Sequence, residues 1–367
     1  MSNKISFICT NLKSGGTQRV VSTISSIYAN KGHKVTIITL DNPNEDFYKV
    51  NSNIKRININ QIKDSNNLFI GIFQNFIRVF KLRKAIIESE SKTVISFITS
   101  TNIITILASI MLKVNVIVSE RNDPYLQKIN FKWRALRYLT YPLAKKITAN
   151  SYKAIDFYKK KFFNSRILYL PNPLPAINPG THGENVILSI GKLEIQKGHD
   201  ILLNAFAECI KRNTITSRWK IKIIGSGKEL NSLLSLAKKL EISDSLIIKS
   251  NINLTNEYKN AGIFIMASRY EGTSNALLEA ISSGMPIIVS SNAAFSVPFI
   301  RNKHNSIIIE NMNFQNLSEE ILNLIKDKQK RKEYSINILK DYAEHITNNN
   351  IIDMWNEALD INQNEKN

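Results

Sequence analysis

The sequence predicts an α/β protein built from two doubly wound domains, each with a parallel sheet between helices. Short apolar runs alternate with stretches of helical periodicity along the whole chain, as βαβ units do. The chain has 367 residues, more than one compact core usually holds. Four prolines between Pro171 and Pro179 interrupt the alternation near its middle. Neither a helix nor a central strand continues through them, so we place the interdomain linker there.

The expected elements follow the apolar pattern in order. In the first half, strands are expected at 5–10, 35–40, 57–59, 94–97, 114–119, 146–150 and 167–169, and helices at 18–30, 73–87, 103–112, 131–143 and 153–162. In the second half, strands are expected at 186–190, 219–224, 246–249, 263–266, 287–290 and 306–309, and helices at 199–211, 229–240 and 275–283, with a helical end. We expect an N-terminal domain over 1–175, a C-terminal domain over 183–345, and a last helix in 346–367 that packs back toward the N-terminal domain.

Composition indicates a folded protein of the cytoplasm. The first residues lack the apolar core of a secretory signal. The longest apolar stretch, 103–118, is interrupted by Lys113 and Asn115 and is shorter than the roughly 20 residues that a membrane-spanning helix needs. Cys9 and Cys209 lie far apart in apolar contexts, which suggests neither a disulfide framework nor a zinc site.

Positive charge is concentrated in the first half of the chain. Residues 1–180 hold 27 Lys and Arg against 9 Asp and Glu, whereas the remainder holds 22 against 21. This asymmetry favours an anionic partner for the first half: a phospholipid surface, a lipid-linked pyrophosphate or nucleic acid. A solvated basic face without a partner is the alternative.

The loop after the expected strand 186–190 has the composition of a diphosphate-binding loop. It is bounded by glycines, enters a helix, and carries Lys192 and Lys197. A flexible backbone and two ammonium groups suit a diphosphate. An ordinary surface loop with two lysines is an equally good interpretation of this segment alone.

The loop after strand 263–266 offers two carboxylates, Glu271 and Glu279, the second in a helix. Glu279 lies in an apolar context, where a glutamate is costly unless it is paired or liganded. An exposed helical glutamate is the alternative. Thr273 or Ser274 suits the N-cap of this helix, whose first amides would face an anion near Glu271. The residues expected to present these groups are Thr273, Ser274, Asn275 and Ala276.

Together these motifs resemble the retaining glycosyltransferases of family 4, which have the GT-B fold. The matching segments are Gly-Lys-Leu-x-x-Gln-Lys-Gly at 191–198, Ile-Gly-Ser-Gly-Lys-Glu at 224–229 and the Glu-x7-Glu element at 271–279. The segments 14–19 and 149–173 match as well. The resemblance covers nearly the whole chain and implies two Rossmann-like domains that face each other across a cleft.

The resemblance also implies roles for single residues. Lys192 and Lys197 would bind the donor diphosphate, although the family more often has Arg at the first position. Glu271 would hold hydroxyls of the donor sugar and stabilise positive charge that develops on it, and Glu279 would bind the ribose. The further donor contacts implied are the backbone of Gly15 and Gly16 and, near the base, Ile252.

One segment departs from the family. Many relatives carry a His after the fifth N-terminal strand, where this chain has Ser119, Glu120 and Arg121. Glu120 is the natural substitute as a catalytic group, and Arg121 would contact donor or acceptor. A capped turn before Pro124 is the alternative interpretation.

The resemblance implies transfer of a sugar from a nucleotide diphosphate, with UDP-hexose or UDP-N-acetylhexosamine favoured, to an undecaprenyl-pyrophosphate-linked saccharide. Such a reaction belongs to the synthesis of bacterial O-antigen, capsule or a related surface glycan. No Asp-x-Asp motif is present, so we expect no metal and no cofactor. A GT-B-fold nucleotide-sugar epimerase and a basic nucleic-acid-binding protein are the alternatives. We expect no nucleic acid as a partner.

Two segments are candidates for peripheral attachment to the cytoplasmic face of the inner membrane. Residues 131–139 mix aromatic side chains with cations, and the expected helix 73–87 carries Arg78, Lys81, Arg83 and Lys84. Core helices whose cations extend to the surface explain both segments equally well.

Overall fold

The computed structural model describes residues 2–13, 15–41, 46–48, 50–61, 68–125, 127, 129–163, 165–173, 175, 177–250, 252–348 and 351–361, without the side chains of 68–72 and 346–348. Residue 14 of the 14–19 motif, and residues 349–350 and 362–367 of the expected C-terminal helix, lie outside this set. The chain divides into two compact units. Unit 1 comprises Met1–Pro173 and Ile351–Asn367, and unit 2 comprises Leu174–Asn350.

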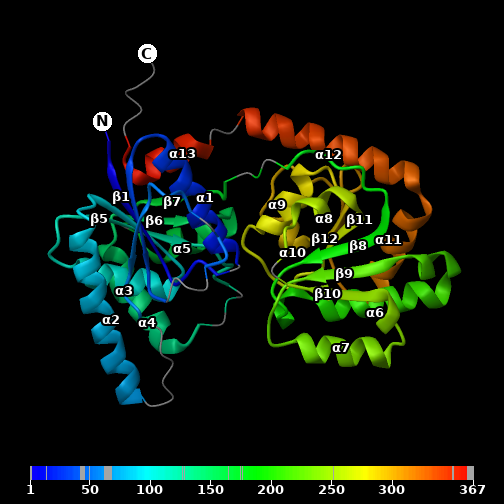
Figure 1. Cartoon of the computed structure of the whole chain (residues 1–367), viewed down its shortest axis with the longest axis horizontal. Coiled ribbons are helices and arrows are strands. Elements are labelled where there is room, and N and C mark those ends of the chain that lie inside the picture. The colour runs from blue at the N-terminus through cyan, green and yellow to red at the C-terminus, as the bar shows by residue number, and fades with distance from the viewer. Residues whose placement is uncertain are drawn as a thin grey trace. The chain divides into compact units, whose positions relative to one another are not determined.

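Unit 1 is a parallel sheet covered by helices on both faces (Figure 1). The strand order is β3-β2-β1-β4-β5-β6-β7, and every paired neighbour is parallel. The strands are β1 (Lys4–Cys9), β2 (Lys34–Thr39), β3 (Lys55–Asn58), β4 (Thr93–Phe97), β5 (Asn115–Glu120), β6 (Lys146–Ala149) and β7 (Ile167–Tyr169). The helices are α1 (Gly16–Asn30), α2 (Leu68–Glu88), α3 (Thr99–Ser109), α4 (Phe131–Thr140), the short 3-10 turn Tyr141–Leu143, α5 (Tyr152–Lys161) and α13 (Ile351–Leu359).

The C-terminal helix α13 belongs to unit 1. Trp355 is fully buried there and its indole nitrogen donates to Pro171 O at 3.1 Å. The buried Lys146 ammonium donates to Ala358 O at 3.1 Å and to Asp360 Oδ1 at 2.6 Å. These contacts tie the chain end to strand β6 and to the residues that leave β7.

The outward face of α2 is apolar. Phe73, Phe76 and Phe80 lie on this face, and they are 67%, 71% and 61% exposed. The helix packs on the core through its opposite side, where Leu82 and Ile86 are buried. Periodicity finds an apolar face but does not say which of two such faces turns inward.

Unit 2 is a second parallel α/β layer structure, with the strand order β10-β9-β8-β11-β12-β13. Its strands are β8 (Glu184–Ile190), β9 (Lys220–Ile224), β10 (Leu246–Lys249), β11 (Ala261–Met266), β12 (Ile287–Ser290) and β13 (Ile307–Ile309). Its helices are α6 (His199–Arg212), α7 (Leu230–Lys239), α8 (Thr255–Asn260), α9 (Asn275–Ser282), α10 (Ser291–Ala294), α11 (Phe314–Lys326) and α12 (Lys328–Asn348), with short 3-10 turns at Ile195–Lys197, Thr214–Arg218 and Ser243–Ser245.

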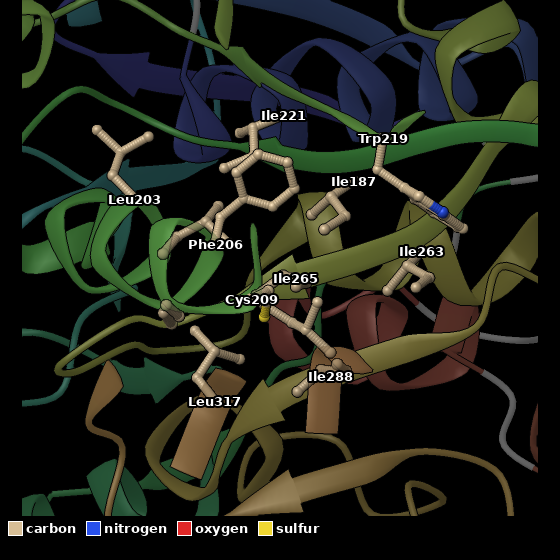
Figure 2. Packing of buried hydrophobic residues seen from close by; sticks show 14 of the residues in the cluster. Ile187, Leu203, Phe206, Cys209, Trp219, Ile221, Ile263, Ile265, Ile288 and Leu317 are labelled. Atoms are coloured by element: carbon tan, nitrogen blue, oxygen red, sulfur yellow. The ribbon is translucent and has the colours of Figure 1, made fainter. Parts of the chain in front are cut away.

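One hydrophobic core of unit 2 lies between the sheet and the helices α6 and α11. Phe206 and Cys209 of α6 meet Ile221 and Ile263 of the sheet, and Leu317 of α11 closes the cluster (Figure 2). Burying such side chains contributes about 1.5–3 kcal/mol each, so this layer holds the strand ends in place. The prediction of two parallel-sheet α/β domains is confirmed.

Two further observations concern expectations from composition. Within the described residues, no helix is both long and apolar enough to cross a membrane. Cys9 and Cys209 are buried free thiols, and burial raises the pKa of each to about 12. Thiols with such pKa values are poor nucleophiles.

Candidate active site

The predicted donor loops lie at the topological switch point of unit 2. The chain passes from β8 to β9 on one side and later returns to β11 on the other side of β8. Parallel sheets bind ligands at the carboxyl ends of strands where the winding reverses. The loops after β8 and β11, residues 191–198 and 267–274, therefore stand next to each other.

Glycines allow these loops to approach closely. Gly198 has a φ of +67°, and a Cβ placed on it would stand 2.1 Å from Ala267 O. A Cβ on Gly225, after β9, would stand 1.9 Å from Gly191 O. Only a residue without a side chain fits at either point. The glycines of the family motifs thus serve to pack three loops against one another.

Lys197 and Glu271 form an ion pair that joins the two loops. The Lys197 ammonium contacts Glu271 Oε1, and Ser268 Oγ donates to the same oxygen at 2.9 Å. The Lys197 and Glu271 side chains are 18% and 7% exposed. The two residues predicted to hold the diphosphate and the sugar therefore already touch each other. Lys192 is exposed on the same loop as Lys197.

A second contact, not foreseen from the sequence, holds the loops together beside this pair. The Arg269 guanidinium bonds both oxygens of Asp200, at 2.9 Å and 2.7 Å, and donates to Ile195 O at 2.5 Å. The Arg269 amide donates to Gln196 O, and Gln196 Nε2 donates to Tyr270 O, each at 2.8 Å. Asp200 follows Gly198 by two residues and Arg269 precedes Gly272 by three. Opposite charges in two segments expected to be neighbours were the available signal.

The predicted helix after the second loop is α9, and it begins as expected. Ser274 is its N-cap residue, but the Ser274 side chain makes no capping hydrogen bond. Anion binding by the backbone amides of Asn275 and Ala276 stays a prediction. Thr273 is half-buried beside them. Glu279 is only 2% exposed, so the alternative of an exposed helical glutamate is wrong.

His199, which was not predicted as a site residue from the sequence, lies directly after the loop 191–198 that carries Lys192 and Lys197. It is 3% exposed, and its Nδ1 stands 3.4 Å from Ser189 Oγ. Burial, with the charge of Lys197, lowers the pKa of His199 to about 4. The ring is therefore neutral at physiological pH and adds no charge to the site. A His at the first position of α6, directly after the motif glycine Gly198, was the available signal.

The remaining predicted donor contacts are more scattered. Ile252 follows β10 and packs, partly buried, against the core on the α9 face of the sheet. In unit 1, β1 leads through Gly15 into α1, which begins at Gly16. β1 lies between β2 and β4, so this loop occupies the switch point of unit 1. The donor contacts of Ile252, Gly15 and Gly16 stay predictions.

Glu120 ends strand β5 and is buried within unit 1. Thr99 Oγ1 donates to both carboxylate oxygens, at 2.9 Å and 3.1 Å, and the Tyr141 hydroxyl donates to Oε1. Asn102 Nδ2 adds a contact at 3.4 Å. Burial raises the pKa of Glu120, and the hydrogen bond from Tyr141 opposes that shift. Ile98, which precedes Thr99, has a φ of 73°, a strained value for a β-branched residue.

Arg121 connects three parts of unit 1. Its Nη1 donates to Leu170 O at 3.0 Å and to Asn172 Oδ1 at 2.9 Å. The guanidinium lies 5.4 Å from the ring centroid of Phe97 and 5.3 Å from that of Trp355. Burial lowers the pKa of Arg121 to about 9. In this structure Arg121 anchors the residues after β7 and helix α13 to the sheet, and the predicted roles of Glu120 and Arg121 in the reaction stay predictions.

Comparison with known proteins places the fold and these motifs in one family. The model described as Glycosyltransferase Family 4 matches residues 14–176, and the model described as Glycosyl transferases group 1 matches residues 174–341. The chain belongs to family 4 of the GT-B glycosyltransferases. The resemblance inferred from the motifs is confirmed, and the chain is a glycosyltransferase.

Two bacterial proteins are similar to this family 4 glycosyltransferase over most of its length. A Campylobacter jejuni protein named GalNAc-alpha-(1->4)-GalNAc-alpha-(1->3)-diNAcBac-PP-undecaprenol alpha-1,4-N-acetyl-D-galactosaminyltransferase is 29% identical over 358 residues, which cover 92% of this chain and 96% of that protein. The amylovoran biosynthesis glycosyltransferase AmsD of Erwinia amylovora is 25% identical over 356 residues, which cover 94% of this chain and 96% of that protein.

Solved structures agree with the GT-B fold. A variant of S. aureus TarM, in complex with UDP, superposes with a TM-score of 0.81 at 12% identity, over 97% of this chain and 99% of its own. The GT-B prediction is therefore confirmed. The described part of this chain holds no cluster of three or more His, Cys, Asp or Glu side chains suited to a metal ion. Metal independence stays a prediction.

Proposed function

We propose that this glycosyltransferase moves a hexose or N-acetylhexosamine from a UDP-sugar to an undecaprenyl-pyrophosphate-linked saccharide, with retention of anomeric configuration. The observation that carries the proposal is the Lys197–Glu271 pair at the switch point of unit 2. It combines an ammonium group for a diphosphate with a carboxylate for sugar hydroxyls. The named acceptor of the Campylobacter jejuni relative supports the lipid-linked acceptor.

The Lys197–Glu271 pair suggests how the donor is received. The ammonium and the carboxylate neutralise each other in this pair. A diphosphate competes for the Lys197 ammonium and frees the Glu271 carboxylate for the sugar. Ser268 keeps its hydrogen bond to Glu271 Oε1 and so holds the carboxylate in position. Lys192, the first-turn amides of α9 and the buried Glu279 are proposed to complete the nucleotide site.

The proposed chemistry needs no protein nucleophile. The bond between the sugar C1 and the diphosphate oxygen breaks, and a bond from C1 to the acceptor hydroxyl oxygen forms on the same face. The acceptor proton passes to the departing diphosphate, which leaves as UDP. Lys197 and the helix amides stabilise the negative charge on the leaving group, and Glu271 stabilises the positive charge on the sugar.

The proposed acceptor determines where in the cell the reaction takes place. A saccharide on an undecaprenyl lipid is confined to a membrane, so we propose that the protein works peripherally at the cytoplasmic face of the inner membrane. The surplus of 18 positive charges in residues 1–180 supports attraction to anionic lipids. The product is the lipid-linked saccharide extended by one sugar, as surface-glycan synthesis requires.

Nucleotide release from a panel of UDP- and GDP-sugars tests the proposal. Each donor is supplied with and without a lipid-pyrophosphate saccharide, to the full-length protein and to Glu271→Ala. We expect slow release from one UDP-sugar, an increase when the acceptor is added, and loss of both in Glu271→Ala. The anomeric configuration of the product is read by NMR. Consumption of no donor, or an inverted product, contradicts the proposal.

A further inference from the structure

Three tyrosines gather at one corner of unit 1, where its last three strands end. β5, β6 and β7 are parallel neighbours in the sheet, so their carboxyl ends lie at the same edge. Tyr125 lies in the loop after β5, Tyr152 is the first residue of α5 after β6, and Tyr169 is the last residue of β7. Ligands of parallel sheets bind at this edge. We call these three residues the tyrosine ledge.

The Tyr152 ring is fixed on one face and open on the other. It stacks on the Tyr169 ring, with ring centroids 4.5 Å apart and planes inclined by 15°. Tyr152 is nevertheless 57% exposed, whereas Tyr169 is half-buried. The helical turn that carries Tyr152 is capped by Ser151, whose Oγ accepts from the Ala154 amide at 3.3 Å. A rigid aromatic face is therefore presented to solvent at the ligand edge.

Tyr125 adds a second ring that is held by α5. It is 50% exposed, and its ring meets that of Phe157 edge-on, with centroids 5.0 Å apart. The Lys153 ammonium lies 5.7 Å from the Tyr125 ring centroid and pairs with Asp123 at 2.7 Å. Asp123 Oδ1 also accepts from the Tyr125 amide at 2.9 Å. The turn after β5 and the first turns of α5 thus fix this ring together with a cation.

The composition of the ledge suits a saccharide. One face of a pyranose ring carries C–H groups with partial positive charge, and the face of an aromatic ring is negative. The sugar hydroxyls at the rim need hydrogen-bond donors and acceptors, which tyrosine hydroxyls and the Lys153 ammonium can supply. An alkyl chain would contact the rings but would leave these polar groups without a role.

The position of the ledge selects a saccharide of several sugars. In the strand order of unit 1, β7 lies three strands away from β4, which borders the switch point at the loop of Gly15 and Gly16. Neighbouring strands are about 4.8 Å apart, so this separation is roughly 14 Å. A single sugar at the switch point does not extend over that distance, but an oligosaccharide does.

We propose that the tyrosine ledge is an acceptor subsite, which stacks a sugar ring remote from the hydroxyl that reacts. Tyr152 supplies the main stacking face, and Tyr125 with Lys153 supplies the second contact. This inference rests on the proposed function, since that function requires a saccharide acceptor. The ledge favours acceptors of several sugars over acceptors of one sugar, and so contributes to the choice of substrate.

Acceptor kinetics with the full-length protein test the subsite. The donor is the UDP-sugar found in the panel, and the acceptor is the lipid-pyrophosphate saccharide that stimulates its turnover, prepared with a short, water-soluble prenyl chain. Tyr152→Ala should raise KM for the acceptor and lower kcat/KM for it about tenfold, with KM for the donor unchanged. Tyr152→Phe keeps the ring and should behave like the unaltered protein. Tyr152→Leu keeps apolar bulk without a π face and should resemble Tyr152→Ala.

Phe163→Ala is the matched control, because Phe163 is 94% exposed and lies beyond the opposite end of α5. It should leave all kinetic constants unchanged. With an acceptor shortened to one sugar, Tyr152→Ala should differ little from the unaltered protein. Melting temperatures check that each variant folds. Unchanged kcat/KM for the full acceptor in Tyr152→Ala, or an equal loss in Phe163→Ala, overturns the proposal.

Saturation-transfer NMR distinguishes failure of the subsite from failure of the proposed function. Aromatic protons of the protein are irradiated in the presence of the methyl glycosides of glucose, galactose, N-acetylglucosamine and N-acetylgalactosamine. We expect transfer to the C–H protons of at least one glycoside, reduced in Tyr152→Ala and kept in Phe163→Ala. If this holds while no UDP-sugar is consumed, the proposed function fails and the subsite stands. No transfer to any glycoside, or transfer that Tyr152→Ala leaves unchanged, refutes the subsite.

Discussion

Asp200 and Arg269 form a two-pronged ion pair between the loops that present Lys197 and Glu271. Asp200 lies in the first turn of α6 and Arg269 lies in the loop 267–274, so the pair sets the distance between the two proposed donor-binding groups. Both side chains are partly exposed, at 44% and 37%. Such a pair adds about 1 kcal/mol or less to stability, so its importance lies in geometry.

Arg269→Lys keeps the charge but lacks the planar guanidinium that forms two parallel hydrogen bonds to Asp200. We expect kcat/KM for the donor to fall about tenfold to 100-fold because the loops lose their fixed spacing. The melting temperature should change little. Steady-state kinetics with the donor found in the panel measures the effect. Kinetic constants equal to those of the unaltered enzyme contradict a positioning role.

The same pair predicts that the stability of the fold decreases at acidic pH. Burial alone raises the pKa of Asp200, but the hydrogen bonds and charge of Arg269 outweigh it and hold the pKa below its usual value. The stabilisation is therefore present above the unfolded pKa of about 4 and is lost as the pH falls through the lower, folded pKa. Asp200→Asn should remove this part of the acid dependence. A pH titration of melting temperature, compared between the two proteins, measures it.

Glu271→Gln separates nucleotide binding from sugar transfer. The carboxylate competes with the donor diphosphate for the Lys197 ammonium, so its removal should leave UDP binding equal or a few times tighter. Turnover should fall about 100-fold or more, since charge stabilisation at the sugar is lost. Calorimetry with UDP and the nucleotide-release assay report the two quantities.

A matched control for that variant is available in unit 2. Glu257 pairs with Lys222 at 2.7 Å, and both side chains are similarly protected, at 17% and 15% exposure. Glu257→Gln should change neither UDP affinity nor turnover. Weaker UDP binding in Glu271→Gln but not in Glu257→Gln contradicts competition for Lys197.

The burial of Glu120 predicts that the free energy of unfolding decreases as the pH rises. Burial raises its folded pKa, so the native state holds the proton more tightly than the unfolded state does. The stability due to this group is greatest below the unfolded pKa of about 4.3 and decreases as the pH rises toward the folded pKa. Glu120→Gln should lose this slope. Melting temperatures from pH 5 to 8.5 measure the difference between the two proteins.

Tyr141→Phe removes the hydroxyl that donates a hydrogen bond to Glu120 and so tests the same buried cluster. Removal of the hydroxyl leaves a buried carboxylate with one hydrogen bond fewer, at a cost of about 1–3 kcal/mol. The loss should be larger at pH 8 than at pH 5. Tyr334→Phe is the control, because the buried Tyr334 hydroxyl has no hydrogen-bond partner among the described residues. Equal losses in the two variants contradict the role of the Tyr141 bond.

The donor loops were predictable from the sequence because they depend on order along the chain. Alternating strands and helices dictate a parallel sheet, and the sheet brings the ends of β8 and β11 together. The topology of the sheet alone therefore predicts that Lys197 and Glu271 lie close together, as the structure shows. The short helix α8, residues Thr255–Asn260, was missed because six residues with a single aromatic side chain, Tyr258, show no apolar periodicity.

The burial of Glu120 could not be predicted in the same way. A residue at the end of a strand is expected near the ligand edge, but its side-chain direction depends on partners from other segments. Thr99 and Tyr141 supply the donors that hold it inside. The sequence also did not show which side of α2 is exposed, because both sides are apolar and tertiary packing decides which of them is buried.

Gly198→Ala tests whether close approach of the two loops sets the donor site. Gly198 has a left-handed φ, and the added methyl would collide with Ala267 O, so the backbone must shift. We expect a loss of roughly 1–3 kcal/mol in stability and about 100-fold in turnover, since Lys197 moves relative to Glu271. Gly183→Ala is the control, because a Cβ there meets nothing within 4 Å. A Gly198→Ala enzyme with full turnover would show that the loops work without this contact.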